Sequence, residues 1–122
     1  MDEYEEKKNK LIYDALHNNL VHLQKWDIDE CFAGEFPRYF EADTLGEIVE
    51  HAKSACGKIK AVLLFVDGDT AICEVSEAVK AIEPYCTADC VDSGKFLFCC
   101  GDESGGKKFR LLLSFEQRNA QL

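Results

Sequence analysis

The sequence predicts an α+β domain, a two-layer α/β sandwich in which two helices pack on one face of a four-stranded mixed sheet. The first observation is the stretch 59–83, where a buried apolar strand runs through an acidic glycine turn into an amphipathic helix. The second is the alternation of apolar and polar residues over 107–116, which is typical of a strand. The third is the order of the expected elements, which is helix, strand, helix, strand, helix, strand and strand.

The first elements follow from the spacing of apolar residues. Residues 2–24 are expected to form one long helix, because apolar side chains recur every three or four positions, as at Ile12, Leu16 and Leu20. Residues 25–34 are expected to be a connector. Residues 35–42 fit a short strand, and Pro37 indicates a sheet edge or a strand start.

The later elements have recognisable ends. Thr44 and Glu47 fit a capping box that begins a helix, and Gly57 fits its end. The helix after the strand 59–66 is expected to stop at Pro84. Two strands, 94–101 and 107–116, follow and are expected to be joined by a hairpin loop at 101–106. We expect the long first helix at one side of the sheet and one buried face on the last strand.

The length and the net charge of the chain limit the number of domains and the kinds of partner that we expect. The chain has 122 residues, which fits one domain (1–122) made of an N-terminal helix (1–24), a connector (25–34) and a sheet-and-helix core (35–122). The formal net charge is −9, so nucleic acid and anionic membranes are not expected partners. No apolar run reaches the roughly 20 residues that span a bilayer, and the acidic start lacks a signal sequence. We expect a cytoplasmic protein whose seven cysteines are thiols.

Several stretches resemble the C-terminal half of the FtsZ/tubulin family. Residues 61–68 resemble the family's apolar strand ending in a glycine turn, and residues 74–78 resemble the start of its next helix. Residues 94–98 and 108–114 resemble its last two strands, and the order of the expected elements is the family's order. The resemblance implies an FtsZ/tubulin C-terminal-domain fold.

The same comparison with the family bears on function. The chain lacks the clustered glycines of the family's phosphate loop, so GTP binding is not expected. The family's synergy loop, N-x-D-x-x-D, enters the nucleotide pocket of the next subunit. Here Asp29 matches its middle position, Asp27 replaces the Asn, Phe32 replaces the last Asp, and Glu30 is out of register. The resemblance therefore implies a non-catalytic interaction loop at Asp27, Asp29 and Glu30.

Two classes of function remain open. The first is a non-enzymatic interaction module without a cofactor, which binds a protein partner or itself and regulates or caps filament assembly. The second is a small-molecule-binding oligomer, because the layout also resembles the chorismate mutase type and the deaminase-like Rid family. In that case Arg110 would orient a ligand in a cleft between subunits.

Possible metal sites have simpler interpretations. Cys86 and Cys90 have C-x₃-C spacing, which leaves a zinc-stabilised adaptor as a third hypothesis. However, Cys99 and Cys100 are adjacent on a strand and point to opposite faces, so both cannot complete one tetrahedral site. We favour thiols that fill core space and expect no metal. In the turn Asp67-Gly68-Asp69, capping is favoured over cation binding.

Histidines and aromatic residues also favour structural roles. His17 and His22 are five residues apart, which is not the spacing of two metal ligands on one helix face, and for both of them and for His51 a surface or half-buried position is favoured. Five aromatic residues gather in and after the connector, and core packing is favoured over a contact surface. They are Trp26, Phe32, Phe36, Tyr39 and Phe40.

Overall fold

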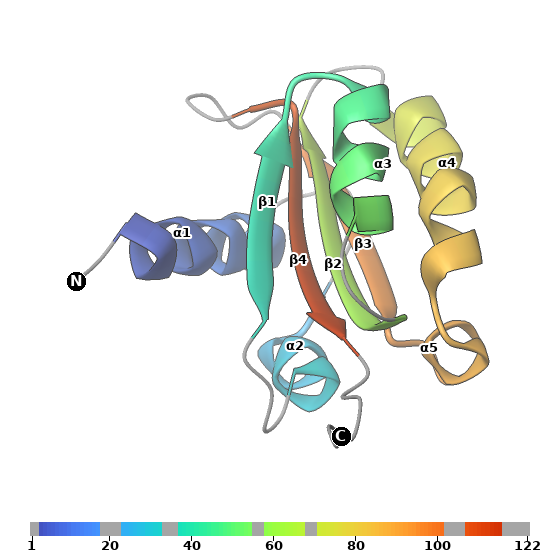
Figure 1. The fold of residues 1–122 in the computed structure, drawn as a ribbon. Helices are drawn as coiled ribbons and strands as arrows, with labels where there is room; N and C mark the ends of the chain where they lie inside the picture. Colours follow the sequence, from blue (N-terminus) through green and yellow to red (C-terminus); the bar gives the residue numbers. More distant parts are fainter. Residues whose placement is uncertain are drawn as a thin grey trace.

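A computed structural model of the chain describes residues 3–17, 23–32, 37–54, 58–67, 71–101 and 107–115, and it confirms the α+β class with a four-stranded mixed sheet. The strands are β1 (Arg38–Ala42), β2 (Ile59–Asp67), β3 (Phe96–Gly101) and β4 (Phe109–Phe115) (Figure 1). The helices are α1 (Glu3–His17), α2 (Lys25–Cys31), α3 (Leu45–Ser54), α4 (Ala71–Ile82), the 3₁₀ turn η1 (Glu83–Tyr85) and α5 (Ala88–Asp92).

The order of the strands in the sheet is β1–β4–β2–β3. Strand β4 is antiparallel to both neighbours, so that Leu111 lies opposite Phe40 on one side and Leu64 on the other. Strands β2 and β3 are parallel. Because β2 separates β3 from β4, the expected hairpin between the last two strands is wrong. The linking residues 102–106 lie outside the described part of the chain.

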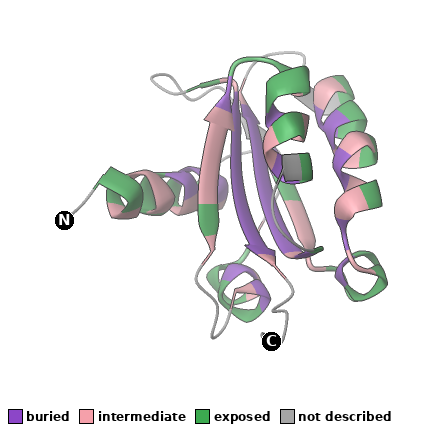
Figure 2. Cartoon of the chain, in the orientation of Figure 1, coloured by how far each residue is buried: buried purple, intermediate pink, exposed green. Residues whose placement is uncertain are grey.

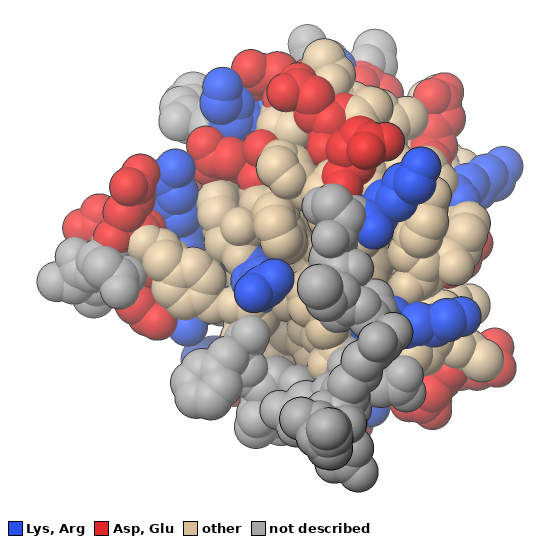
Figure 3. All heavy atoms as spheres, in the orientation of Figure 1, with Lys and Arg blue, Asp and Glu red and all other residues tan. Residues whose placement is uncertain are grey.

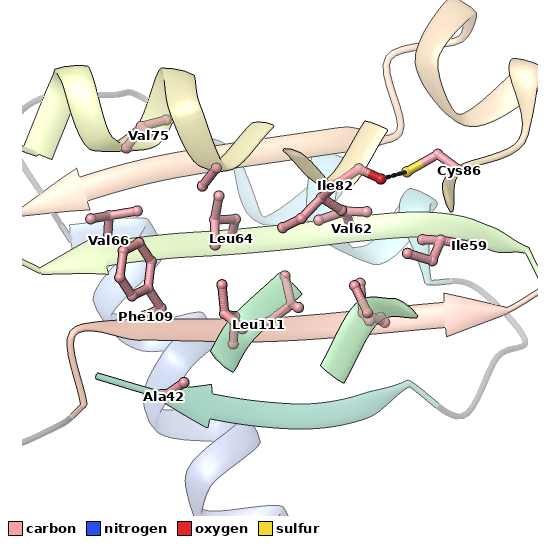
Figure 4. Close-up of a cluster of buried hydrophobic side chains, with 14 of the residues drawn as sticks. Ala42, Ile59, Val62, Leu64, Val66, Val75, Ile82, Cys86, Phe109 and Leu111 are labelled. Atoms are coloured by element: carbon pink, nitrogen blue, oxygen red, sulfur yellow. Dashed lines mark hydrogen bonds between the residues drawn. The ribbon is translucent and has the colours of Figure 1, made fainter. Parts of the chain in front are cut away.

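Helices α3 and α4 cover one face of the sheet, as the sequence predicted (Figure 1). Helix α3 begins at the expected capping box, in which Thr44 Oγ1 accepts from the backbone N–H of Glu47 at 3.2 Å. On this face Leu64 and Val66 of β2 meet Val75 of α4 (Figure 4). Helix α4 ends at Ile82 and the 3₁₀ turn η1 begins at the next residue, Glu83, because Pro84 cannot continue a regular α-helix.

Helices α1 and α2 cover the opposite face. Leu11 and Ala15 of α1 and Ile28 of α2 pack on Leu63 and Phe65 of β2. In Figure 1 the C-terminal end of helix α1 lies behind β1, on the face opposite α3 and α4, while the rest of the helix projects past that edge of the sheet, so α1 packs at one side as expected. The sheet therefore has α3 and α4 on one face, as in a two-layer sandwich, and α1 and α2 on the other face.

Strand β4 is buried on both faces, as the purple strand in Figure 2 shows, although its alternation predicted one buried face. Leu111 belongs to the core under α3 and α4, whereas Leu112 belongs to the core under α1 and α2. The prediction of one solvent-exposed face was wrong because the polar residues of the alternating pattern, Arg110 and Ser114, are buried. Polar residues in a strand can thus face a second core when they find partners there.

Two short helices and one boundary differ from the sequence prediction. Helix α2 occupies most of the expected connector 25–34, and α5 lies between η1 and β3 where no element was expected. The first helix is described to His17, residues 18–22 lie outside the described residues, and Leu23 and Gln24 are not helical. No helix in the described ranges is long and apolar enough to cross a membrane.

Candidate binding surface around helix α2

The three residues of the predicted interaction loop lie in helix α2. The backbone N–H of Gln24 donates to Asp27 Oδ2 at 3.0 Å, which satisfies a donor at the helix start. Asp29 Oδ2 lies 3.0 Å from Lys25 Nζ, one helical turn away. Ile28 and Cys31 are three positions apart and point to the protein interior. The expected loop is therefore a helix anchored by its apolar side.

A hollow of about 240 Å³ opens between α2 and the turn that leads into β3, and we call it the α2 hollow. The turn contains Gly94 at φ 70°, a left-handed conformation that favours glycine. This geometry ends α5 and directs the chain into β3 beside α2. Two of the three predicted residues, Asp27 and Glu30, line the hollow. The other lining residues are Trp26, Cys31, Ser93, Gly94, Lys95 and Leu97.

Trp26 is the most exposed large hydrophobic side chain in the described residues, at 63%. The expectation that it packs in the core is wrong. Phe32 and Tyr39 are partly buried against the core under α1, whereas Phe40 packs on the other face of the sheet. Phe36 lies outside the described residues. The aromatic residues therefore form no single cluster, because neighbours on β1 point to opposite faces.

The charges of the α2 hollow are two carboxylates and one ammonium. Asp27 and Glu30 face the hollow together with Lys95, whose Nζ also lies 3.7 Å from Asp89 Oδ2. Burial raises the pKa of the Cys31 thiol to about 11, so this lining residue is uncharged at neutral pH. An exposed indole beside carboxylates suits binding of a cationic or amphipathic group, and a protonated thiol is a poor nucleophile.

Asp29 points to the other side of α2, toward a second hollow of about 300 Å³. This second hollow lies between α1, α2 and the start of β1, and its lining includes Ile12, Phe32 and Leu112. The structure therefore brings Asp27 and Glu30 together and separates Asp29 from them by the width of the helix.

Arg110 is enclosed by its own chain. Its Nη1 lies 2.7 Å from Asp14 Oδ2, and its guanidinium carbon lies 4.5 Å from the centre of the Phe65 ring. The residue is 5% exposed. A ligand-orienting role of Arg110 in a cleft between subunits stays a prediction, and the guanidinium already has a carboxylate partner.

The candidate metal ligands have other contacts. In the part of the chain that the structure describes, no three His, Cys, Asp or Glu side chains are placed to hold a metal ion. His17 Nδ1 lies 2.7 Å from the carbonyl oxygen of Tyr13, and His51 stacks on Phe40. His22, Gly68 and Asp69 lie outside the described residues. Cys86 and Cys90 are buried thiols.

Acidic side chains gather where β1 leads into α3 and where α4 begins (Figure 3). Asp43 and Glu74 line a hollow of about 230 Å³ there. Lys107 Nζ lies 3.1 Å from Asp43 Oδ2, and Lys108 Nζ lies 2.6 Å from Glu74 Oε2. These ion pairs offset part of the negative charge, so this face offers a weaker case for a binding site than the α2 hollow.

Sequence reasoning found the acids of α2 but not the residues opposite them. The three-residue spacing of Ile28 and Cys31 was a usable signal for a helix. Nothing local in the sequence indicates that Lys95 and Leu97 face α2, because that contact depends on the placement of β3 at the sheet edge. No protein-family model matches this sequence, and neither does a curated protein or a solved structure.

Proposed function

We propose that this chain is a non-enzymatic protein-interaction module and that the α2 hollow, with Trp26 at its rim, is its docking surface. The exposure of Trp26 carries the proposal. Tryptophan is enriched among residues that dominate binding energy at interfaces, where its ring fills a pocket of the partner. Removing such apolar area from water is favourable by about 25 cal/mol per Å².

The resemblance to the C-terminal half of the FtsZ/tubulin family suggests the partner. The described helices and strands occur in the order that motivated the resemblance, with α2 and α5 added. In that family the segment matched by residues 27–32 enters the nucleotide pocket of the next subunit. We propose that α2 docks on a filament subunit and limits filament growth, because the chain lacks a phosphate loop of its own.

A cytoplasmic location is part of the proposal. The reducing cytoplasm keeps cysteines as thiols, and the described Cys31, Cys73, Cys86, Cys90 and Cys99 are all unbridged.

The test is FtsZ assembly with GTP, followed by light scattering and by phosphate release. An excess of the chain is expected to lower both signals, and Trp26→Ala is expected to weaken the effect by roughly tenfold or more. Tyr13→Ala is the matched control, because Tyr13 is 58% exposed but lies on α1. Unchanged assembly and turnover at excess would rule out the filament partner.

A native mass spectrum of the chain alone separates the two classes of function. If the chain is an interaction module, its native mass should be that of polypeptide alone, without a retained small molecule. A trimer that carries extra mass from a bound compound would favour the oligomer with clefts between subunits.

A further inference from the structure

The two edges of the sheet differ in charge. The strand order places β1 at one edge and β3 at the other, and among the described residues no strand pairs with the outer side of either (Figure 1). Strand β1 carries Arg38 and Glu41, and charges on an edge strand oppose pairing with another chain. Strand β3 reads Phe-Leu-Phe-Cys-Cys-Gly and carries no charge. The edge at β3 therefore lacks the protection that β1 has.

The backbone of β3 offers hydrogen-bonding groups to the outside. The carbonyl of Lys95 accepts from the N–H of Val62 at 2.9 Å, so the backbone groups of Lys95 point to β2. Successive residues of a strand direct their N–H and C=O groups to opposite sides, so every second residue after Lys95 also points to β2. The residues between them, whose N–H and C=O groups point away from the sheet, are Phe96, Phe98 and Cys100.

An exposed aromatic side chain lies in the middle of this edge. Phe98 is 42% exposed, although its neighbour in register on β2, Leu64, is fully buried. Because Leu64 belongs to the core under α3 and α4, the Phe98 ring lies on the same face of the sheet. A strand added at this edge would cover the ring if it brought an apolar side chain to the position opposite Phe98.

We propose that β3 is the interface of a homodimer, in which β3 of a second copy pairs antiparallel with it and continues the sheet across a two-fold axis. The axis passes beside Phe98, which lies opposite Phe98 of the partner subunit. The proposal rests on the edge strand and does not depend on the docking function of α2.

A register centred on Phe98 satisfies the whole edge. The two Phe98 residues form a hydrogen-bonded pair, and Phe96 of each copy pairs with Cys100 of the partner subunit. Every outward N–H and C=O group of β3 then has a partner. Residues directly opposite each other in a sheet share a face, so the two Phe98 rings cover each other. A second copy thus supplies both the backbone groups and the apolar side chain that this edge needs.

The charge of the chain makes the dimer sensitive to salt. Two uncharged strands place no like charges opposite each other, but each chain carries a formal net charge of −9. Salt screens the repulsion between the two chains, so the dimer should tighten as the salt concentration rises. An interface built on ion pairs would weaken instead. Because β3 has six residues, the interface is small, and we expect a dissociation constant in the micromolar range.

Sedimentation velocity of the full chain tests the dimer, with reductant present so that no disulfide joins two copies. Over a concentration series the average mass should rise from one chain toward two, and more steeply at high salt. Phe98→Lys places two ammonium groups opposite each other and should abolish the dimer. Tyr13→Lys is the matched control, because it makes the same change of charge at an exposed aromatic residue of α1 and should leave the dimer intact.

Amide hydrogen exchange of the wild-type chain locates the interface without a variant. The N–H groups of Phe96 and Phe98 should exchange quickly in the monomer and become protected as the concentration rises. The N–H of Leu97 points to β2 and should be protected at every concentration.

Four results would overturn the proposal. The first is a chain that stays monomeric up to about 1 mM, where even a weak pairing would be half formed. The second is a dimer in which exchange at Phe98 is unchanged. The third is protection of Phe98 in the monomer, because another part of the same chain would then cover the edge. The fourth is a dimer that Trp26→Ala disrupts and Phe98→Lys does not, which would place self-association at the α2 hollow.

Discussion

Asp14 and Arg110 are 96 residues apart in the sequence and form a buried ion pair, with 2.7 Å between Asp14 Oδ2 and Arg110 Nη1. The pair joins α1 to the central strand β4 beneath the helix. Arg110 Nε has no hydrogen-bond partner in the described residues, so Asp14 is the main compensation for the buried guanidinium. Lys10 Nζ approaches the same carboxylate at 2.9 Å from the solvent side. The ion pair thereby fixes where α1 packs on the sheet.

Asp14→Asn is expected to destabilise the fold by about 3–5 kcal/mol, because it leaves a buried charge without its counter-ion. The double variant Asp14→Leu with Arg110→Met is expected to recover much of this loss, since both charges are then removed. Urea unfolding followed by far-UV circular dichroism measures the difference.

The control is Lys25→Ala, which breaks the exposed ion pair with Asp29 and should cost about 1 kcal/mol or less. Equal effects of Asp14→Asn and Lys25→Ala would contradict the buried position of α1 on β4.

Leu112→Ala tests the second hydrophobic core. Leu112 is 1% exposed and packs with α1, so its truncation should lower the free energy of unfolding by about 2–5 kcal/mol. Val91→Ala, at an exposed position of α5, should change it by roughly 0.5 kcal/mol or less. Thermal unfolding of the two variants side by side gives the answer. A negligible effect at Leu112 would mean that α1 does not cover this face.

The Cys31 thiol predicts a pH dependence of stability. Its pKa is raised by burial from 9.0 to about 11 in the folded state, so the folded protein holds the thiol proton more tightly than the unfolded chain. The associated stability is complete below pH 9 and is lost as the pH rises toward 11. The difference in unfolding free energy between wild type and Cys31→Ala should therefore narrow over this interval in urea titrations. A constant difference would show that the thiol is not enclosed by the fold.

Trp26 is the single tryptophan of the chain, so its fluorescence reports on the α2 hollow alone. An exposed indole should emit as it does in water, and the emission should shift to shorter wavelength when a partner covers it. Because Asp27 and Glu30 line the same hollow, caesium ions should quench the emission more strongly than iodide ions. Glu30→Gln should reduce this preference. Equal quenching by both ions would place the indole away from the two acids.

Local patterns predicted the elements well where one pattern dominated. The apolar run of β2 and the capping box at Thr44 and Glu47 gave two elements that the structure confirms. Helix α2 was missed because the spacing of Ile28 and Cys31, its one helical signal, stands among charged residues in a segment of only seven residues.

The positions of the elements in space were harder to predict than the elements themselves. Whether β3 pairs with β4 or with β2 depends on contacts between distant segments, and both arrangements satisfy the same local patterns. The burial of Arg110 likewise required knowing that Asp14 would lie opposite it. The exposure of Trp26 also depends on how α2 packs against the rest of the fold. Ile28 and Cys31 are the buried residues of the helix, and Trp26 lies outside that buried side.

Strand β4 completes the sheet late in synthesis, because it is translated after β1, β2 and β3 and yet lies between β1 and β2. Strand β1 pairs with no strand other than β4 among the described elements. Until residues 109–115 leave the ribosome, β1 and one edge of β2 present unpaired backbone groups to other nascent chains. The growing polypeptide is therefore most exposed to aggregation, and most in need of a chaperone, between the emergence of β2 and that of β4.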